Sequence, residues 1–394
     1  MNYKKMLDDI LKILEEKHID CYFNISKNEL NNYIEYALKK YDLKDKYDFF
    51  YITNVIIKKI FGIYDSHTKL IWNNAEFNLP IRLKYINGKL YIIRTDEKNK
   101  DLLYGEIIKI NNIEISQLIE EIKDMTAYST TGFLARPIET ILYNGIKMRS
   151  LPSIDSSTTE FQYEILINDK IIKRTLTKQE DKLCNVNKPQ DNYVCEVRDG
   201  IIYIVYNSCR EEYENQMIEF VNKIKELSLT NNIKKYIVDI RGNLGGNSNI
   251  INPLIDYLNG KEVITLVDEY VFSGGRFAIF DLKNIGSKFV GTGIATSLNC
   301  FGNSPSIIFD EYKLPICNKY FYMDTACELE NFRCANSKEE FASLKQNLKY
   351  FVPQIFEPDY YVAKTIEDYK NGQDPQFDKA LELMTTEKKN KLLI

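Results

Sequence analysis

The sequence predicts a mixed α/β protein of more than one domain, with a helical beginning, a strand-rich middle and an alternating α/β remainder. The chain has 394 residues, which is more than one ordinary domain holds. Its composition is globular, since 44% of the residues are hydrophobic and 27% are charged. The spacing of the apolar residues changes near residues 75 and 190, which divides the chain into three parts.

Residues 1–75 are expected to be helical. The stretches "MLDDILKILEE" and "NELNNYIEYALKKY" carry apolar residues at helical spacing, and the second follows "ISK", which supplies a helix cap. A third helix, "FFYITNVIIKKIFGIY", is apolar enough to be more buried than the others. It ends at "YDSHTKLIW", where Asp, Ser and Thr indicate a turn.

Residues 76–190 are expected to form short strands and turns. Two alternating runs around Asn87-Gly88 predict a β-hairpin, because this pair favours the tight turn that joins two strands. A second hairpin is predicted to turn at Asn168-Asp169. Between the hairpins, "LLYGEIIKINNIEISQLIEEIKDM" predicts a strand, a turn and a helix.

Residues 191–394 change to strands that alternate with helices, which predicts an α/β layer with parallel pairing. The predicted strands are "GIIYIVYNSC", "KKYIVDI", "VITLV" and "KFVGT". The helix between the first two strands has one apolar face, formed by Met217, Phe220, Val221 and Ile224. Further along, "SIIFDEYKLPICNKYFYM" returns to strands.

Charge and cysteine content argue against two classes of protein. The formal net charge is -4 and no dense basic patch is present, which disfavours nucleic-acid binding. None of the eight cysteines forms a CxxC pair, so a structural zinc site is not expected and reduced, mostly buried thiols are. The close pairs Cys184/Cys195 and Cys327/Cys334 could form disulfides if the protein were exported.

The N-terminal stretch lacks the apolar core of a signal peptide. No run approaches the ~20 apolar residues that span a bilayer. We therefore expect a cytoplasmic protein with no membrane span, and export only if a leader has been removed. The sequence leaves the oligomeric state open.

A glycine-rich stretch, "DIRGNLGGNS" at residues 239–248, directly follows a predicted buried strand. Closely spaced glycines let backbone N–H groups approach a ligand, so the stretch could bind phosphate or form an oxyanion hole. It is not a P-loop, because the Lys-Ser/Thr ending is missing. The alternative is a tight strand-to-helix turn without a ligand.

A serine, Ser273, stands between the predicted strand "VITLV" and a helix that begins in "VFSGGRFAIF". Acyl-transfer enzymes often place their nucleophile on such a strand-to-helix turn. If Gly274 begins the helix, its N–H group and the helix dipole face charge that develops beside the serine oxygen. The alternative is a serine that only caps the helix.

A serine nucleophile needs a base, and the chain contains only two histidines, His18 and His67. His67 follows a helix in the turn "DSHTKLIW", where its side chain can reach a cleft. His18 lies in the charged stretch "EEKHID" and is expected to be a surface or packing residue. The alternative for His67 is a turn histidine that is satisfied by Asp65 or Ser66.

These stretches together resemble the C-terminal processing, or tail-specific, serine peptidases, whose core is shared with the tricorn protease. "YIVDIRGNLGG" is similar to the family's strand and glycine loop, and "FSGGRFAIFDLKNIGSKFVGT" to its nucleophile turn, helix and next strand. "DSHTKL" is similar to the stretch that carries the base in members that use histidine. "LLYGEIIKINNIEI" resembles part of the family's PDZ-like region, and the resemblance covers nearly the whole chain.

Two departures from the family pattern bear on the site. Many members have a lysine base after the nucleophile helix, but this chain has Ser297 near that place, so a lysine dyad is excluded there. A gap-free match with the family turn puts Gly274, instead of Ser273, at the nucleophile position. That register would describe a catalytically inactive homologue. Ser273 is nevertheless the only hydroxyl on the turn.

The resemblance implies a layered, crotonase-like α/β protease core of the ββα type, at residues 191–394. It implies a helical domain at 1–75 that carries the base and a small PDZ-like region at 76–190 that receives a peptide end. The implied activity is serine endopeptidase hydrolysis through an acyl-enzyme, without metal or cofactor, on peptide or protein substrates. Ser273 would be the nucleophile and His67 the general base. The oxyanion hole would come from Gly245, Gly246 and Gly274.

An acidic third member would orient the histidine, and the sequence does not fix it. The candidates are Glu328, Glu357 and Asp359 from the C-terminal region, because Asp65 lies too close to His67 along the chain to be preferred. Two other functions stay open at this point. One is a catalytically inactive peptide-binding protein on the same scaffold, and the other is a hydrolase of small esters.

Overall fold

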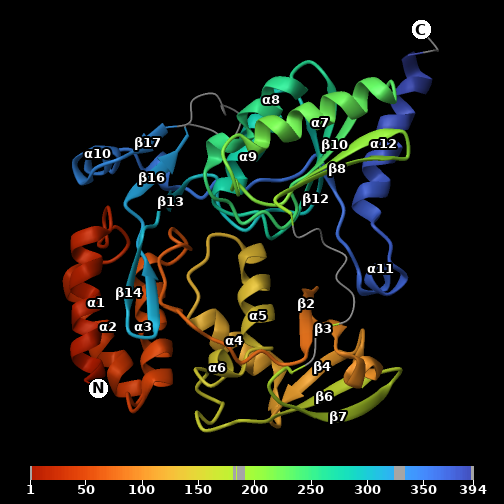
Figure 1. Cartoon of the computed structure of the whole chain (residues 1–394). Helices are drawn as coiled ribbons and strands as arrows, with labels where there is room; N and C mark the ends of the chain where they lie inside the picture. The colour runs from red at the N-terminus through yellow and green to blue at the C-terminus, as the bar shows by residue number, and fades with distance from the viewer. Residues whose placement is uncertain (1, 181–182, 184–190, 324–332, 392–394) are drawn as a thin grey trace. The chain divides into compact units, whose positions relative to one another are not determined.

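The computed structural model describes residues 2–180, 183, 191–323 and 333–391, and the chain divides into two compact units (Figure 1). Of the described residues, unit 1 comprises 2–180, 183, 299–323 and 333–353, and unit 2 comprises 191–298 and 354–391. The three-part prediction placed everything after residue 190 in one α/β domain. In the structure, described residues 299–323 and 333–353 belong to unit 1 instead. The strand Tyr312–Pro315, which lies in the first of these stretches, pairs with Ile71–Trp72.

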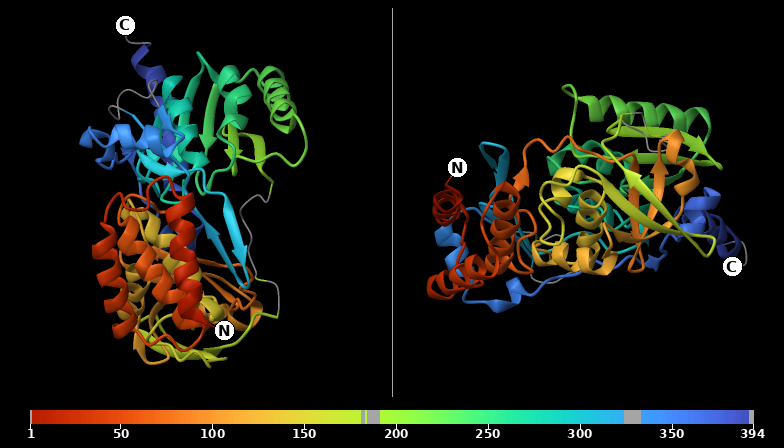
Figure 2. Two further views of the ribbon diagram at one scale, coloured as in Figure 1. Left: turned by 90° about the vertical axis from the view of Figure 1, so that its left-hand side faces the viewer. Right: turned by 90° about the horizontal axis from the view of Figure 1, so that it is seen from below.

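Unit 1 begins with three helices that lie side by side (Figure 2). They are α1 (Tyr3–Lys17), α2 (Lys27–Lys40) and α3 (Lys46–Phe61). The predicted cap before the second helix is confirmed: Ser26 accepts from the amide of Glu29, whose side chain accepts in return from the amide of Ser26. Helix α3 is buried along most of its length, as its apolar sequence predicts.

An antiparallel sheet with the strand order β2-β3-β4-β6-β7 follows in unit 1, and β5 pairs with β4. Its strands are β2 (Ile81–Ile86), β3 (Lys89–Thr95), β4 (Glu106–Ile110), β5 (Ile113–Glu114), β6 (Phe161–Ile167) and β7 (Lys170–Leu176). Both predicted hairpins are confirmed, because the turn residues have the positive φ angles that such tight turns require. These angles are 50° and 83° at Asn87 and Gly88, and 48° and 61° at Asn168 and Asp169.

Helices α4 (Ile115–Asp124), α5 (Ala135–Ile141) and α6 (Gly145–Met148) accompany this sheet. One continuous apolar core contains side chains from α1 to α3, from the sheet and from these helices. The predicted return to strands near residue 306 is also confirmed. One small sheet of unit 1 contains β1 (Ile71–Trp72), β14 (Ser306–Phe309) and β15 (Tyr312–Pro315). A second contains β13 (Cys300–Gly302), β16 (Lys319–Tyr322) and β17 (Arg333–Ala335). Helix α10 (Lys338–Leu344) follows the last strand.

Unit 2 is built on a six-stranded sheet with the order β18-β12-β11-β10-β9-β8. Its strands are β8 (Tyr193–Arg198), β9 (Ile201–Tyr206), β10 (Lys235–Asp239), β11 (Glu262–Val267), β12 (Lys288–Gly291) and β18 (Tyr360–Tyr361). All neighbouring pairs are parallel except β8 and β9, which confirms the predicted parallel layer. The carboxyl ends of parallel neighbours lie at one edge, so the segments that follow β10 and β11 start side by side.

Helices cover both faces of this sheet (Figure 1). They are α7 (Gln216–Thr230), α8 (Asn252–Leu258), α9 (Gly274–Asn284) and α12 (Pro375–Lys391), whereas α11 (Ile366–Asn371) buries none of its residues. Tyr236 of β10 bonds through its hydroxyl to Tyr257 of α8, whereas the next residue, Ile237, shares an apolar cluster with Phe377 of α12. Successive strand residues face opposite sides, so α8 and α12 lie on opposite faces. Helix α7 buries the four predicted residues, Met217, Phe220, Val221 and Ile224.

Within the described ranges, none of the helices combines the length and the apolar character that a bilayer span needs. Six of the eight cysteines lie in these ranges, and all but the last of them are buried: Cys21, Cys195, Cys209, Cys300, Cys317 and Cys334. Cys184 and Cys327, which the sequence named as partners in conditional disulfides, lie outside the described residues.

Candidate active site

Ser273 occupies a strained turn between β11 and α9. Its backbone angles are φ 52° and ψ -121°. A residue with a Cβ atom pays of order 1–3 kcal/mol for such a conformation, which is why it is usually a glycine position. A strained serine between a strand and a helix is the arrangement that exposes a nucleophile at the end of an α/β sheet.

Helix capping does not explain this serine. An N-cap serine has extended backbone angles, and its hydroxyl accepts from an amide of the first helical turn. Ser273 has neither feature, since its φ is positive and its side chain makes no capping hydrogen bond to α9. The backbone carbonyls of Phe272 and Ser273 instead accept from the amides of Gly275 and Arg276, at 3.0 Å each. The hydroxyl is therefore not committed to the helix.

The glycine loop after β10 interlocks with the serine turn, backbone against backbone. A Cβ atom at Gly245 would lie 2.3 Å from the amide nitrogen of Gly274, and one at Gly274 would lie 2.6 Å from the carbonyl oxygen of Gly246. A Cβ atom at Gly246, where φ is 142°, would lie 2.2 Å from the carbonyl oxygen of Cys209. These positions have no space for a side chain, so the sequence needs glycine at all three.

Two amides beside Ser273 have no acceptor among the residues that the structure describes, those of Gly246 and Gly274. The amide of Gly245 is different, because it donates to Oδ1 of Asn243 at 2.8 Å. Asn243 is fully buried, and its Nδ2 donates to the carbonyl of Tyr206 at 2.9 Å. The amide of Gly245, which the sequence offered as an oxyanion donor, is thus already committed to Asn243.

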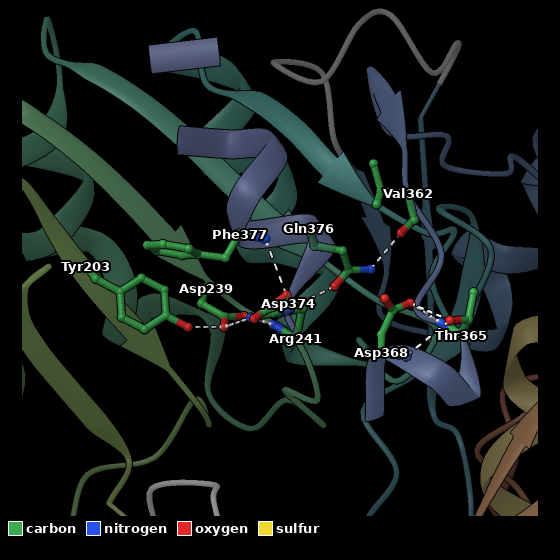
Figure 3. Close-up of polar contacts among 9 residues, drawn as sticks. All are labelled: Tyr203, Asp239, Arg241, Val362, Thr365, Asp368, Asp374, Gln376 and Phe377. Atoms are coloured by element: carbon green, nitrogen blue, oxygen red, sulfur yellow. Dashed lines mark hydrogen bonds and ion pairs between the residues drawn. The ribbon is translucent and has the colours of Figure 1, made fainter. Parts of the chain in front are cut away.

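A partly buried ion network holds the start of the glycine loop (Figure 3). The Arg241 guanidinium donates to the Asp239 carboxylate at 2.9 and 2.6 Å and to the Asp374 carboxylate at 2.8 Å through each of two nitrogens. It also donates to Gln376 at 2.8 Å, and Tyr203 donates its hydroxyl to Asp239. Asp374 directly precedes α12, so the network fastens the loop to the start of that helix.

Replacing Arg241 by methionine is expected to lower the free energy of unfolding by about 3–5 kcal/mol, because two facing carboxylates lose the cation between them. We expect kcat to fall as well, because the glycine loop loses its attachment to α12. Thermal unfolding and peptide hydrolysis below the melting temperature measure both effects.

The matched control is Asp368→Asn. Asp368 forms a capping box with Thr365 at the start of α11 and does not contact Arg241 (Figure 3). Its replacement is expected to cost about 1 kcal/mol and to leave kcat unchanged. Equal kcat values for the two variants would contradict the role given to the network.

His67 lies in unit 1, in a buried turn after α3. Oδ1 of Asp65 accepts from the backbone amides of His67 at 2.7 Å and Thr68 at 3.1 Å, which closes the turn. Nδ1 of His67 lies 4.0 Å from the same oxygen. Asp65 thus determines the backbone of the turn, and it is an acidic group close to the imidazole.

His18 is the packing residue that the sequence offered as one of two alternatives. It is fully buried, its ring packs against Phe61 and Phe301, and its Nε2 lies 3.1 Å from Oδ2 of Asp65. Burial alone raises the pKa of Asp65, but the hydrogen bond from His18, together with the neighbouring His67 and Thr68, outweighs burial and holds this pKa below its usual range. Asp65 is therefore ionised at neutral pH.

The predicted site residues divide between the two units. Ser273, Gly245, Gly246 and Gly274 come together in unit 2, and His67 lies in unit 1. Among the acidic candidates, Asp359 accepts from the amide of Phe289 at 2.7 Å and so supports β12. Glu357 also belongs to unit 2, and Glu328 lies outside the described residues. Ser297 is bonded to the backbone of Gln354, which is a structural role.

Sequence reasoning missed three residues of these surroundings. They are Arg241, Asn243 and Cys317; the last donates its thiol to Oδ1 of Asp65 at 3.4 Å. An arginine and an asparagine inside a glycine loop were a usable signal, since a loop without helix or strand bonds needs side chains to fix it. For Cys317 no signal existed, because 252 residues separate it from Asp65.

A strained serine that caps no helix, at the carboxyl edge of a parallel sheet and beside open amides, is the kind of arrangement in which hydrolases place a nucleophile. Residues 200–292, from β9 to β12, match the model of peptidase family S41. This match over part of the chain supports a serine peptidase hydrolase. No curated protein sequence matches it.

Solved structures of low sequence identity resemble nearly the whole chain. Mature CPAF complexed with lactacystin has a TM-score of 0.61 and 10% identity over 98% of both chains. A point mutant of CPAF has a TM-score of 0.64 and 10% identity over 98% of this chain and 97% of that one. The photosystem II D1 C-terminal processing protease has a TM-score of 0.45 and 9% identity over 92% and 94%. The likeness to CPAF shows a shared mixed α/β fold.

Proposed function

We propose that the chain is a serine endopeptidase that hydrolyses peptide bonds through an acyl-enzyme on Ser273. The observation that carries the proposal is the strained, non-capping backbone of Ser273. A costly conformation at a residue without a structural role is expected where the exposed hydroxyl is used in chemistry. The family match covers this turn.

In the proposed reaction, Oγ of Ser273 attacks the substrate carbonyl and His67 takes the hydroxyl proton. The amides of Gly246 and Gly274 stabilise the oxyanion, and each such donor typically contributes ~10²–10³-fold to kcat. His67 then gives its proton to the leaving amine, and water releases the acyl group by the reverse sequence. The mechanism requires the imidazole to come within hydrogen-bonding reach of the hydroxyl in the active protein.

The clash at Gly274 argues against the alternative that the chain is a catalytically inactive homologue. That alternative assigns the nucleophile position to residue 274, which would then have lost a serine. A Cβ atom there would lie 2.6 Å from the oxygen and 2.7 Å from the nitrogen of Gly246. The turn of this chain is built for glycine at 274, which supports Ser273 as the nucleophile.

Three finer features belong to the same proposal. The antiparallel sheet of unit 1 serves as a PDZ-like region, in which a peptide end pairs with an edge strand. The sheet of unit 2 with its helices is the crotonase-like protease core. Five of the six described cysteines are buried, which is typical of reduced thiols in a cytoplasmic compartment.

Covalent labelling tests the proposal. A fluorophosphonate is expected to modify one residue, Ser273, as read by mass spectrometry of the digested protein. Lactacystin, with which mature CPAF forms a complex, should modify the same position. Labelling should disappear in Ser273→Ala, slow by orders of magnitude in His67→Ala and persist in Ser248→Ala, a serine of the glycine loop.

Folded protein that takes no label would contradict the proposal and favour the peptide-binding alternative. If the protein takes the label, kcat/KM for a set of peptides and of small nitrophenyl esters decides between the two hydrolases. We expect cleavage within peptides. Turnover of esters alone would favour the small-ester hydrolase.

A further inference from the structure

Three metal-ligating side chains of unit 1 converge in a buried place. Asp65 and His67 come from the turn after α3, and Cys317 lies between β15 and β16. One ligand atom from each lies within 4.8 Å of the others. The carboxylate oxygen is 3.4 Å from the sulfur and 4.0 Å from Nδ1 of the histidine. All three side chains are almost completely shielded from solvent.

The surrounding residues hold this cluster in place. The amide of Asp20 donates to Nδ1 of His18 at 3.1 Å, so that nitrogen is unprotonated and the proton resides on Nε2. Nε2 then donates to Oδ2 of Asp65, and Oδ1, which also accepts from the amides of His67 and Thr68, faces the histidine ring and the thiol. The amide of Cys317 donates to Oγ1 of Thr68 at 3.1 Å, which fastens the two segments together. Metal ligands are typically oriented by such outer hydrogen bonds.

The spacing suits a tetrahedral ion. Zinc bonds of about 2.0–2.3 Å place ligand atoms roughly 3.3–3.8 Å apart, so the distances here need shifts of only a few tenths of an ångström to about 1 Å. Thiolate, imidazole and carboxylate together are a borderline-soft set that favours Zn²⁺ over Mg²⁺ or Ca²⁺. A divalent ion would also balance the two negative charges of the carboxylate and the thiolate.

We propose that Asp65, His67 and Cys317 form a Zn²⁺ site and that bound zinc inhibits the peptidase. On binding, the Cys317 thiol releases its proton to solvent, and water takes the fourth position. A neutral imidazole has one free lone pair, so a ring nitrogen bound to zinc leaves the proton on the other nitrogen. His67 then has no lone pair for the proton of Ser273. This inhibition, though not the metal site itself, rests on the proposed role of His67 as the base.

Metal binding by the full-length, chelator-treated protein tests the site without reference to activity. We expect one equivalent of Co²⁺ to produce a sulfur-to-cobalt charge-transfer band and Zn²⁺ to displace it. Competition with a chromogenic chelator should show Zn²⁺ binding at least ~10²-fold weaker in Cys317→Ala and in His67→Gln. Cys195→Ala, which removes a buried thiol in unit 2, should leave the affinity unchanged.

Circular dichroism of each variant separates loss of a ligand from loss of the fold. Equal zinc affinity for the folded Cys317→Ala variant and the original protein, or a cobalt spectrum without the sulfur band, would overturn the metal site. Zinc-saturated protein that cleaves peptide as fast as metal-free protein would overturn the inhibition. A metal-free protein that takes no serine label would contradict the proposed peptidase function, and the cobalt spectrum would still decide the metal site.

Discussion

Replacing Ser273 by glycine is expected to abolish peptide hydrolysis and at the same time to make the protein more stable. The hydroxyl is the proposed nucleophile, and loss of a serine nucleophile typically costs ~10⁴-fold or more in kcat. The stability gain follows from the backbone angles of φ 52° and ψ -121°, which glycine adopts at little cost and serine does not. After the greater freedom of glycine in the unfolded chain is subtracted, we expect a gain of about 1 kcal/mol.

The matched control is Ser273→Ala, which removes the hydroxyl but keeps the Cβ atom and the strain. Both variants should be inactive, and only the glycine variant should unfold at a higher urea concentration. Urea denaturation and kcat/KM for a peptide substrate measure the two effects. If the glycine and alanine variants had the same unfolding midpoint, the inferred strain would be wrong.

Replacing Gly246 by alanine is expected to damage both the fold and the chemistry. The new Cβ atom would lie 2.2 Å from the carbonyl oxygen and 2.9 Å from the carbonyl carbon of Cys209, at a φ of 142°. Backbone on both sides has to move, which we expect to cost about 2–4 kcal/mol of stability. The same movement displaces the amide that we assign to the oxyanion, so kcat should fall by ~10²–10³-fold.

Gly200→Ala is the comparison that separates backbone strain from this clash. Gly200 lies in the turn between β8 and β9 at a φ of 76°, and a Cβ atom there has no neighbour within 4 Å. Its replacement should cost about 1–2 kcal/mol and leave kcat unchanged. Stopped-flow acylation with an activated ester, together with thermal unfolding, measures both variants. A Gly246→Ala enzyme with normal kcat would remove that amide from the proposed oxyanion hole.

The sequence was a sound guide to local structure. Turn pairs such as Asn87-Gly88 predicted the hairpins, because positive φ angles are cheap for these residues whatever surrounds them. The apolar face of α7 was predicted from spacing alone, since any amphipathic helix has to bury that face. The same kind of reasoning located the glycine loop and the serine turn, both at strand ends.

Contacts between distant segments were not accessible in this way. Arg241 and Asp374, which are bonded to each other, are 133 positions apart, and 252 positions separate Cys317 from Asp65. The sequence also could not show whether Gly245 or Gly246 offers its amide to an oxyanion. The amide of Gly245 is used by Oδ1 of Asn243, and this contact is visible only in the folded chain. The assignment of residues 299–324 to unit 1 depends likewise on strand pairing with a segment far away in the chain.

Propensity and periodicity act over a few residues, so the sequence was enough to place Ser273 and the glycines on turns at the ends of strands. It was not enough to show that Ser273 is strained and does not cap α9, that the glycine loop is fastened through Arg241, or that Cys317 lies close to His67. These features arise from close packing of backbone and buried charge, which depends on segments that meet only in the folded chain.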